Sequence, residues 1–308
     1  MNRGDKLIIV AGPTASGKTS FAIKLAQEID AVLINMDSRQ VYKFMDIGTN
    51  KGKIVKTGKK IEAMEINGNS KSIFEFRIEG SEVNGFLFDI VRPDESFTVS
   101  DFIAVSGYLI EYFKSKDQKY IFVGGTGLYI DRLISEFDLP DVKPDEKLRE
   151  KLQKLSTEQL YDELYSLNTE EAISLNPSDR ANKRRLIRRI EIAKAGLKAR
   201  SRQNKIQYKL YYPKFDRKEL YEKIDCRVEK MFEEGLVQEV EDLIRRGYKE
   251  TIPMKGMGYK EVVNYLDGKI TLEECKKEIK KAHRNYAKRQ ITWFEGPNRD
   301  YRLSKVRF

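Results

Sequence analysis

Cysteine, histidine and long apolar runs are all scarce in this sequence of 308 residues. Its two cysteines, Cys226 and Cys275, lie far apart and form no CxxC pair, so we expect neither a disulfide framework nor a structural zinc site. Free thiols are typical of a protein of the reducing cytoplasm. No run of about 18 apolar residues occurs, so we expect no membrane-spanning helix. The single histidine, His283, lies in a basic stretch, and we expect it at the surface rather than in catalysis.

Acidic residues are the minority among the charges: 48 stand against 58 lysines and arginines, which gives a net charge of +10. The excess is concentrated in two stretches. Residues 180–205 hold eleven basic residues and one acidic residue, and residues 276–289 hold seven and one. Clustered positive charge predicts a polyanionic partner such as a nucleic acid, with a solvated helix face as the alternative.

Short apolar runs rich in β-branched residues mark the first half of the chain. Residues 6–11, 31–35 and 120–123 are nearly continuous in apolar character, and residues 86–90 form a possible fourth run. Helical patterns separate them, which is typical of strands buried on both faces of a parallel sheet. Residues 61–78 alternate apolar and polar side chains around Asn67-Gly68, which predicts an inserted antiparallel ribbon.

After about residue 140 the pattern becomes helical. Ser156 with Gln159, and Thr271 with Glu274, each predict a capping box at a helix start. The predicted fold class is therefore α/β, with a P-loop NTPase-like parallel-sheet core and a mainly helical insertion. We expect residues 1–138 and 205–308 to form the core and residues 139–204 to form the insertion, with a role in tRNA contact once the resemblance described below is considered.

The sharpest motif is the sequence GPTASGKT, which fits the pattern GxxxxGK(S/T) between a predicted strand and a predicted helix. Such a loop points successive backbone N–H groups at phosphate oxygens. Lys18 would supply a charge for the terminal phosphates, and the Thr19 hydroxyl would hold Mg²⁺. The predicted phosphate-binding residues are Gly12, Pro13, Thr14, Ala15, Ser16, Gly17, Lys18 and Thr19.

Two further segments follow predicted strands. Asp37 comes directly after the second strand, and a glycine-rich turn at residues 124–127 follows the third. In a parallel sheet both positions face the ligand crevice, where a carboxylate can accept a proton or hold a metal through water. The alternative interpretations are a helix-capping aspartate and an ordinary tight turn.

Five motifs occur in one order along the chain: GPTASGKT, DSRQVYKFMDIGTNK, VGGTGLYI, MKGMGYKE and YAKRQITWF. Together they resemble the tRNA dimethylallyltransferase family in its bacterial form, over residues 7–296. The resemblance implies that the P-loop binds dimethylallyl diphosphate. The prenyl group would then pass to the exocyclic amine of the adenosine immediately 3′ of the tRNA anticodon. One departure is Phe44, near which the family usually has a glycine.

The resemblance also implies roles for matching residues. Asp37 matches the general base for the adenine amine, with Lys18 and Thr19 at the diphosphate and at Mg²⁺. Arg217 is expected to complete the diphosphate site, although a surface charge at a helix start is the alternative. The residues expected to contact tRNA are Asp37, Ser38, Arg39, Gln40, Thr126, Arg184, Arg185 and Arg188.

Three other functions fit parts of the sequence. A small-molecule or nucleotide kinase also needs a P-loop, an aspartate and Mg²⁺, but it does not explain the basic insertion or the last motif. An adenylate isopentenyltransferase would not need so basic a surface. A non-catalytic RNA-binding P-loop protein would not depend on Asp37. We expect a monomer without an obligate protein partner.

Overall fold

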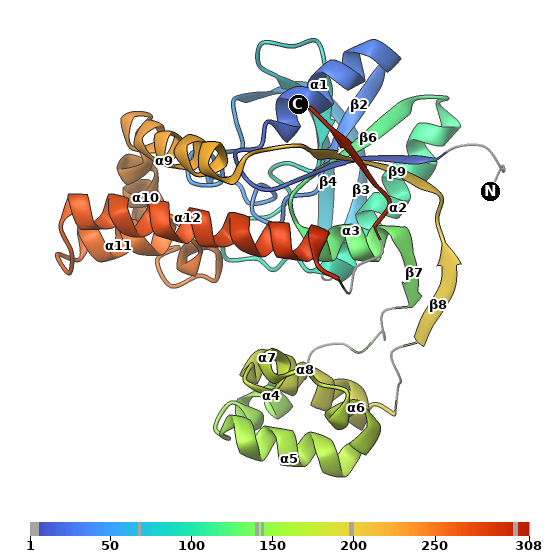
Figure 1. Ribbon diagram of the computed structural model, residues 1–308, viewed down its shortest axis with the longest axis vertical. Helices are drawn as coiled ribbons and strands as arrows, with labels where there is room; N and C mark the ends of the chain where they lie inside the picture. The colour runs from blue at the N-terminus through green and yellow to red at the C-terminus, as the bar shows by residue number, and fades with distance from the viewer. Residues whose placement is uncertain are drawn as a thin grey trace. The chain divides into compact units, whose positions relative to one another are not determined.

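The computed structural model divides the chain into two compact units (Figure 1). Unit 1 comprises residues 1–134 and 206–308, and unit 2 comprises residues 135–205. The sequence analysis places the ends of the insertion at residues 139 and 204, whereas unit 2 begins at residue 135 and ends at residue 205. The structure describes residues 6–66, 69–138, 142, 145–196, 200–297 and 301–307.

Unit 1 is built on one eight-stranded sheet. Its strands are β1 (Leu7–Ala11), β2 (Ala31–Asn35), β3 (Ile54–Ile66), β4 (Asn69–Ile78), β5 (Asn84–Phe86), β6 (Lys119–Gly124), β9 (Tyr208–Pro213) and β10 (Leu303–Val306). The order across the sheet is β10-β9-β1-β6-β2-β5-β4-β3. The first six strands are parallel, and β4 and β3 add an antiparallel ribbon. The predicted P-loop NTPase-like α/β core is therefore confirmed.

Helices cover both faces of the parallel strands. The helices of unit 1 are α1 (Lys18–Ile29), α2 (Val99–Ser115), α3 (Gly127–Ile134), α9 (Arg217–Glu233), α10 (Leu236–Arg245), α11 (Tyr259–Leu266) and α12 (Leu272–Glu295), with a 3₁₀ turn at Pro253–Lys255. Val10 and Ile121 pack with α1, whereas their neighbours Ile9 and Phe122 belong to the cluster that includes α2. Because successive side chains of a strand point to opposite faces, α1 and α2 lie on opposite sides of the sheet. Among the described helices, none has the length and apolar character needed to cross a membrane.

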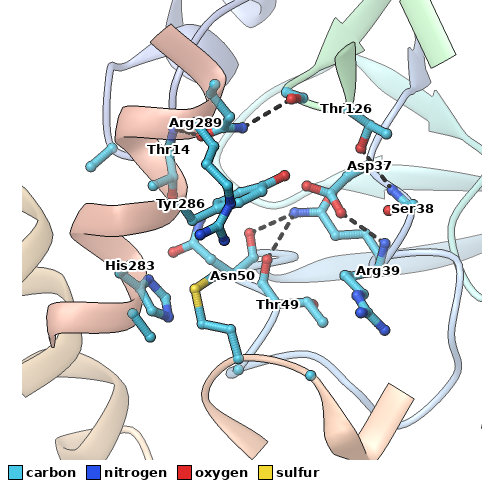
Figure 2. Close-up of a pocket in the computed structure, with 18 of the residues that line it drawn as sticks. Thr14, Asp37, Ser38, Arg39, Thr49, Asn50, Thr126, His283, Tyr286 and Arg289 are labelled. Carbon is cyan, nitrogen blue, oxygen red and sulfur yellow. Dashed lines mark hydrogen bonds between the residues drawn. The ribbon is translucent and has the colours of Figure 1, made fainter. Parts of the chain in front are cut away.

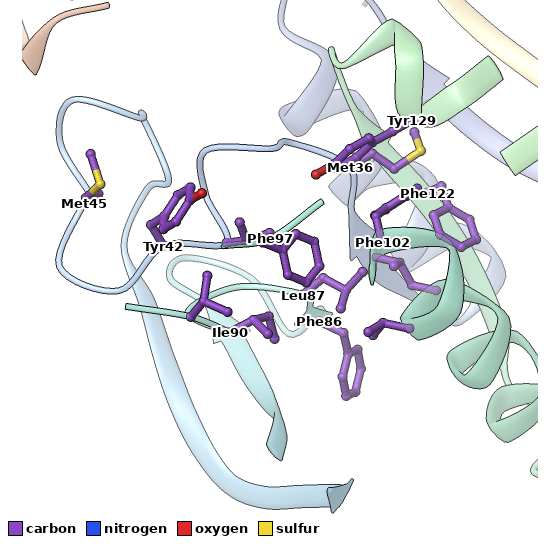
Figure 3. Packing of buried hydrophobic residues seen from close by; sticks show 14 of the residues in the cluster. Met36, Tyr42, Met45, Phe86, Leu87, Ile90, Phe97, Phe102, Phe122 and Tyr129 are labelled. Atoms are coloured by element: carbon purple, nitrogen blue, oxygen red, sulfur yellow. The ribbon is translucent and has the colours of Figure 1, made fainter. Parts of the chain in front are cut away.

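The larger core cluster anchors the loop that follows β2 (Figure 3). Met36 and Met45 are fully buried at the two ends of this loop. Nearby, Phe102 of α2 stacks on Tyr129 of α3 with ring centroids 4.0 Å apart. Burial of such large side chains stabilises the fold by about 1.5–3 kcal/mol each. The loop that carries Asp37 is therefore held from beneath by the core.

The predicted strands are confirmed for β1, β2 and β6, and the ribbon is confirmed as β3 and β4. Its predicted turn, Asn67-Gly68, lies outside the described residues. The fourth apolar run, residues 86–90, was predicted too far along the chain, because the strand β5 ends at Phe86. Leu87 and Asp89 have positive φ values of 65° and 52°, a left-handed conformation that cannot continue a strand.

Unit 2 is a helical bundle on a two-stranded stalk. Its elements are β7 (Ser135–Asp138), α4 (Glu146–Leu152), α5 (Thr157–Leu167), α6 (Thr169–Ile173), α7 (Pro177–Arg180), α8 (Lys183–Lys194) and β8 (Arg200–Lys205). Leu160 and Leu164 of α5 pack against Leu186 and Ile190 of α8, and all four are fully buried. The predicted capping box at Ser156 begins α5. Unit 2 thus has its own apolar core.

Candidate active site

Unit 1 contains a cavity of about 880 Å³ at the carboxyl ends of β1, β2 and β6 (Figure 2). Its walls come from the P-loop, the loop after β2, the turn after β6, the segment 253–260 and the helices α9 and α12. The five sequence motifs therefore meet around one cavity. This is the position at which open parallel sheets bind ligands.

The P-loop connects β1 to α1 as predicted. Gly17 has a φ of 84° and precedes the first residue of the helix, so the backbone curls at this point. Five loop residues line the cavity: Thr14, Ala15, Gly17, Lys18 and Thr19. The other three predicted residues, Gly12, Pro13 and Ser16, do not line it.

Lys18 lies in the cavity without an acidic ion-pair partner among the described residues. Its ammonium nitrogen is 3.4 Å from the backbone oxygen of Pro13. Burial and the nearby charge of Arg227 lower the pKa of Lys18 to about 8, and Asp37 acts in the opposite direction. A buried cation beside a second cation is stabilised by a bound anion.

Arg217, which the resemblance assigned to the diphosphate site, is exposed at the first turn of α9 and does not line the cavity. Arg227, about three turns further along the same helix, does line it. The Arg227 guanidinium donates to the Thr14 hydroxyl at 2.8 Å. A pattern in the sequence could have identified Arg227. This arginine interrupts the apolar stripe that Leu220, Ile224 and Met231 form at helical spacing, and a charged residue on the buried face of a helix is a candidate for function.

Asp37 projects into the cavity from the loop after β2 (Figure 2). Its carboxylate accepts a hydrogen bond from the Arg39 backbone N–H at 2.8 Å, which fixes the side chain close to the chain turn. The Ser38 N–H donates to the Thr126 hydroxyl at 3.2 Å. Asp37, Ser38, Arg39 and Thr126 are therefore brought together, as the sequence predicts.

Gln40 lines the same cavity, but its side-chain amide is hydrogen-bonded to the protein backbone. Its amide nitrogen donates to the backbone oxygens of Thr49 and Asn50, at 3.2 and 2.9 Å. The preceding backbone N–H groups of this loop, at residues 46–48, donate to the Glu239 carboxylate at 2.7–3.0 Å. Tyr259 also donates to Glu239, at 2.8 Å. The loop at residues 46–50 is thus fixed from two sides, and Gln40 positions it rather than pointing free into the cavity.

Helix α12 supplies site residues that the sequence reasoning did not single out. The Gln290 amide accepts from the Thr14 N–H at 2.8 Å and donates to the Gly125 oxygen at 2.9 Å. It therefore joins the P-loop to the turn after β6. At Gly127, a Cβ atom would lie 2.3 Å from the Trp293 indole, so only glycine permits this contact. The motif YAKRQITWF therefore forms one wall of the cavity.

His283 is the clearest departure from the sequence prediction. It was expected at the surface, but its side chain is buried and lines the cavity. The prediction was wrong because α12 packs against α9 and the cavity with the face that carries Ile279, His283 and Ala287. These residues recur at a spacing of four, which is the signal that could have placed His283.

Phe44 adopts a left-handed backbone with a φ of 68°. Glycine reaches this conformation without steric cost, which explains why a glycine is usual near this position in the family. The Phe44 ring lies under the Arg246 guanidinium, 4.5 Å from the ring centroid, and stacks on Tyr248. These contacts offset part of the backbone strain.

The three predicted arginines of unit 2 lie on α8. Arg185 forms an ion pair with Asp179, and Arg188 donates to Glu191 at 3.2 Å and to the Val142 oxygen at 2.9 Å. Arg184 is exposed and has no acidic partner among the described residues. Its role in tRNA contact stays a prediction.

The donors at the cavity suit a magnesium ion bound with its substrate. Thr19 and Asp37 present hydroxyl and carboxylate oxygens to the cavity that holds Lys18. In the part of the chain that the structure describes, no cluster of three or more acidic, histidine or cysteine side chains could hold a metal. Mg²⁺ commonly uses one or two protein ligands together with water and substrate phosphates, so these residues fit it.

Comparison with known proteins identifies the family. The IPP transferase family matches residues 77–297, and the isopentenyl transferase family matches residues 5–95. A tRNA dimethylallyltransferase of Thermoanaerobacter sp. is 36% identical over 306 residues, covering 94% of this chain and 89% of the relative. One from Clostridioides difficile is 37% identical over 297 residues, covering 94% and 88%.

Solved structures agree with these matches. The full-length tRNA isopentenylpyrophosphate transferase of Bacillus halodurans is 34% identical, with a TM-score of 0.66, and the match covers 99% of this chain and 90% of that one. A eukaryotic dimethylallyltransferase acting on tRNA is 25% identical, with a TM-score of 0.70 and coverage of 94% and 70%. The chain therefore belongs to the tRNA dimethylallyltransferase family.

Proposed function

We propose that this protein transfers the dimethylallyl group from dimethylallyl diphosphate to the exocyclic amine of the adenosine immediately 3′ of a tRNA anticodon. The product is isopentenyladenosine in tRNA, and diphosphate is released. The observation that carries the proposal is the single cavity that joins a P-loop to Asp37 and to the basic helix α12. The cysteine usage of the sequence supports a cytoplasmic reaction.

We assign the leaving group and the adenine to different residues of the cavity. Lys18 and Arg227 are cations without acidic partners among the described residues, which suits an anionic leaving group. Asp37 lies on the loop after β2, with Thr126 and Tyr286 nearby. We therefore propose a diphosphate subsite at the P-loop and a base subsite at Asp37.

The reaction then follows from the positions of these groups. The adenine amine attacks the first carbon of the dimethylallyl group, and a C–N bond forms as the C–O bond to diphosphate breaks. The C–O electron pair passes to the diphosphate oxygen, where Lys18 and Arg227 stabilise the added charge. Asp37 accepts the proton that the amine loses. An aryl amine is a poor nucleophile, so orientation by the cavity walls supplies much of the acceleration.

Thr19 would hold Mg²⁺, and the ion would supply positive charge against the phosphate charge. Within the loop, the Thr14 N–H donates to Gln290 and the Ser16 N–H donates to the Pro13 oxygen, at 2.8 and 3.3 Å. The later N–H groups of the loop are therefore the ones that we assign to the phosphate oxygens. Thr14 is already engaged by the protein, since its N–H donates to Gln290 and its hydroxyl accepts from Arg227. Binding therefore relies more on the later part of the loop, at Lys18 and Thr19.

An adenosine stacked within an anticodon loop cannot reach Asp37 without leaving the stack. We therefore propose that the base is extruded into the cavity, at a cost of about a few kcal/mol. Contacts between basic residues and tRNA phosphates offset this cost and make binding sensitive to salt. We assign part of these contacts to unit 2, through Arg184, Arg185 and Arg188, and expect the protein to act as a monomer.

The experiment that tests the proposal uses purified protein, Mg²⁺, dimethylallyl diphosphate and an unmodified tRNA with adenosine 3′ of its anticodon. Mass spectrometry of the digested nucleosides should show isopentenyladenosine. Asp37→Asn should reduce its rate of formation by about 100-fold or more, because the amine proton loses its acceptor. A well-folded protein that forms no product on competent tRNA would refute the proposal.

Two changes of substrate in the same assay distinguish the alternative functions. Transfer of phosphate from ATP to a small molecule would identify a kinase. Prenylation of free AMP in preference to tRNA would identify an adenylate isopentenyltransferase. Neither outcome is expected, because the basic insertion and the last motif have no role in those reactions.

A further inference from the structure

His283 is a buried polar residue whose two ring nitrogens have no hydrogen-bond partner among the described residues. The residue is only 3% exposed. Among the described residues, the other buried side-chain atoms without a partner belong to Ser16, Ser106 and Tyr212, and none of these lines the cavity. Buried polar atoms are nearly always hydrogen-bonded, so two nitrogens without a protein partner at a cavity wall suit a hydrogen bond to a molecule bound in that cavity.

The position of His283 indicates which part of a ligand it would meet. Arg284 forms an ion pair of 2.6 Å with Asp225, which joins α12 to α9 beside both His283 and Arg227. Arg227 in turn donates to Thr14 of the P-loop. Figure 2 shows His283 on the same helix as Tyr286, one turn away.

The electrostatic surroundings of these two α12 residues differ. Burial and then the charges of Asp37 and Arg39 act on the pKa of Tyr286. Burial and then the charge of Arg227 act on His283, and lower its pKa to about 4. Helix α12 thus presents Tyr286 to the Asp37 side of the cavity and His283 to the Arg227 side.

The protonation state of His283 suits an anion that already has cationic neighbours. At neutral pH the imidazole is uncharged and carries one N–H donor and one acceptor nitrogen. Lys18 and Arg227, which line the same cavity, have no acidic ion-pair partner in the part of the chain that the structure describes. A neutral donor adds a hydrogen bond to the bound anion. It adds no third positive charge to repel Lys18 and Arg227 when the anion is not bound.

We propose that His283 donates a hydrogen bond to the diphosphate of the prenyl donor, beside Arg227. This inference rests on the proposed function and names an additional residue of its leaving-group subsite. When the C–O bond breaks, the electron pair stays on the diphosphate oxygen, and a donor already in place stabilises that charge. The His283 proton is not transferred; the proton released in the reaction comes from the adenine amine and goes to Asp37.

The test measures binding of inorganic pyrophosphate by calorimetry, with and without Mg²⁺, to the full-length protein and its variants. His283→Phe keeps the ring shape and removes both nitrogens, so affinity should fall by about 10- to 100-fold. His283→Gln keeps an N–H donor and should stay within about threefold. Lys281→Ala, an exposed change on the same helix, is the matched control. Circular dichroism and thermal melting verify that each variant is folded.

Unchanged pyrophosphate affinity in a folded His283→Phe variant would overturn the inference. A loss confined to tRNA affinity would also overturn it and would assign His283 to the base subsite. Failure of the parent protein to bind pyrophosphate would have the same effect. Pyrophosphate binding that depends on His283 in a protein without prenyl transfer would support the contact while refuting the proposed function, so the two failures are distinguishable.

Discussion

Two basic regions of the molecule use their positive charge in opposite ways. At the cavity, Lys18 and Arg227 have no acidic partner among the described residues, and burial lowers the pKa of each. On α8, Arg188 shares the Glu191 carboxylate with Arg149, whose pKa is raised chiefly by that hydrogen bond. A count of lysines and arginines cannot tell these regions apart. The presence or absence of an acidic partner does.

The Glu191 site shows how much of the charge of unit 2 is structural. Its carboxylate accepts from Arg149 at 2.7 and 3.0 Å, from Arg188 at 3.2 Å and from the Asp145 N–H at 3.1 Å. Burial raises the pKa of Glu191, but these bonds outweigh it and the net shift is downward. The cations are therefore held in place by unit 2 itself, and only the remaining charge is available to a partner.

The largest expected effect follows from removing this carboxylate. Glu191→Ala leaves Arg149 and Arg188 without their shared partner and should destabilise unit 2 by about 3 kcal/mol, because several hydrogen bonds to a charged group are lost while the arginines stay partly solvated. Hydrogen exchange of the α8 amides measures it. Glu146→Ala is the control, because Glu146 is exposed and lies 4.0 Å from Arg149. Equal protection in both variants would show that the buried network is not structural.

The second effect concerns the cavity. Gln290→Ala should lower kcat/KM for the prenyl donor by about 100-fold, since it leaves the Thr14 N–H and the Gly125 oxygen unpaired. Lys288→Ala, an exposed neighbour on α12, should change it by less than about twofold. If Gln290→Ala behaves like Lys288→Ala, the P-loop does not depend on this link.

The third effect is a pH dependence of anion binding. Because the pKa of Lys18 is about 8, the lysine loses its charge as pH rises through that value, and pyrophosphate affinity should fall by about tenfold at pH 9. Below pH 7 the charge is fully present. Lys18→Arg keeps its charge throughout and corrects for the titration of pyrophosphate itself. Parallel curves for the two proteins would contradict the assignment.

The smallest effect tests whether α8 faces tRNA. Arg184→Ala should weaken tRNA binding by about threefold and reduce the salt slope by about one. Arg185→Ala should do less, since the charge of Arg185 is already paired with Asp179. Filter binding across a salt series measures both. Equal affinities and equal salt slopes for the two variants would show that an ion pair with Asp179 does not reduce the contribution of Arg185 to tRNA binding.

Local patterns predicted most of the core and part of the site. The buried strands, the ribbon and the P-loop follow from periodicity and from one motif, because each depends on residues close together in the chain. The strands β9 and β10 were not predicted, since neither is a continuous run of β-branched apolar residues: β9 holds three tyrosines and a lysine, and two of the four residues of β10 are polar.

The residues missed at the site share one property. Arg227, His283 and Gln290 stand on helices that pack against the cavity, and which face of a helix turns inward depends on tertiary contacts. Arg217 was assigned from the family resemblance, and it stands at the start of α9 rather than on the buried face of that helix. Local signals locate the ends of helices, whereas the apolar stripe around Arg227 shows which face is buried.

The point where unit 2 joins unit 1 has a consequence for modularity. The chain leaves unit 1 at Ile134 and returns at Ile206, and the Ile206 N–H donates to the Ile134 oxygen at 3.2 Å. The two crossing points are therefore already closed by a backbone hydrogen bond within unit 1. A segment attached at adjacent ends can be exchanged for a short turn at little entropic cost. Unit 2 can thus vary in length and in surface between related proteins while the catalytic cavity keeps its geometry.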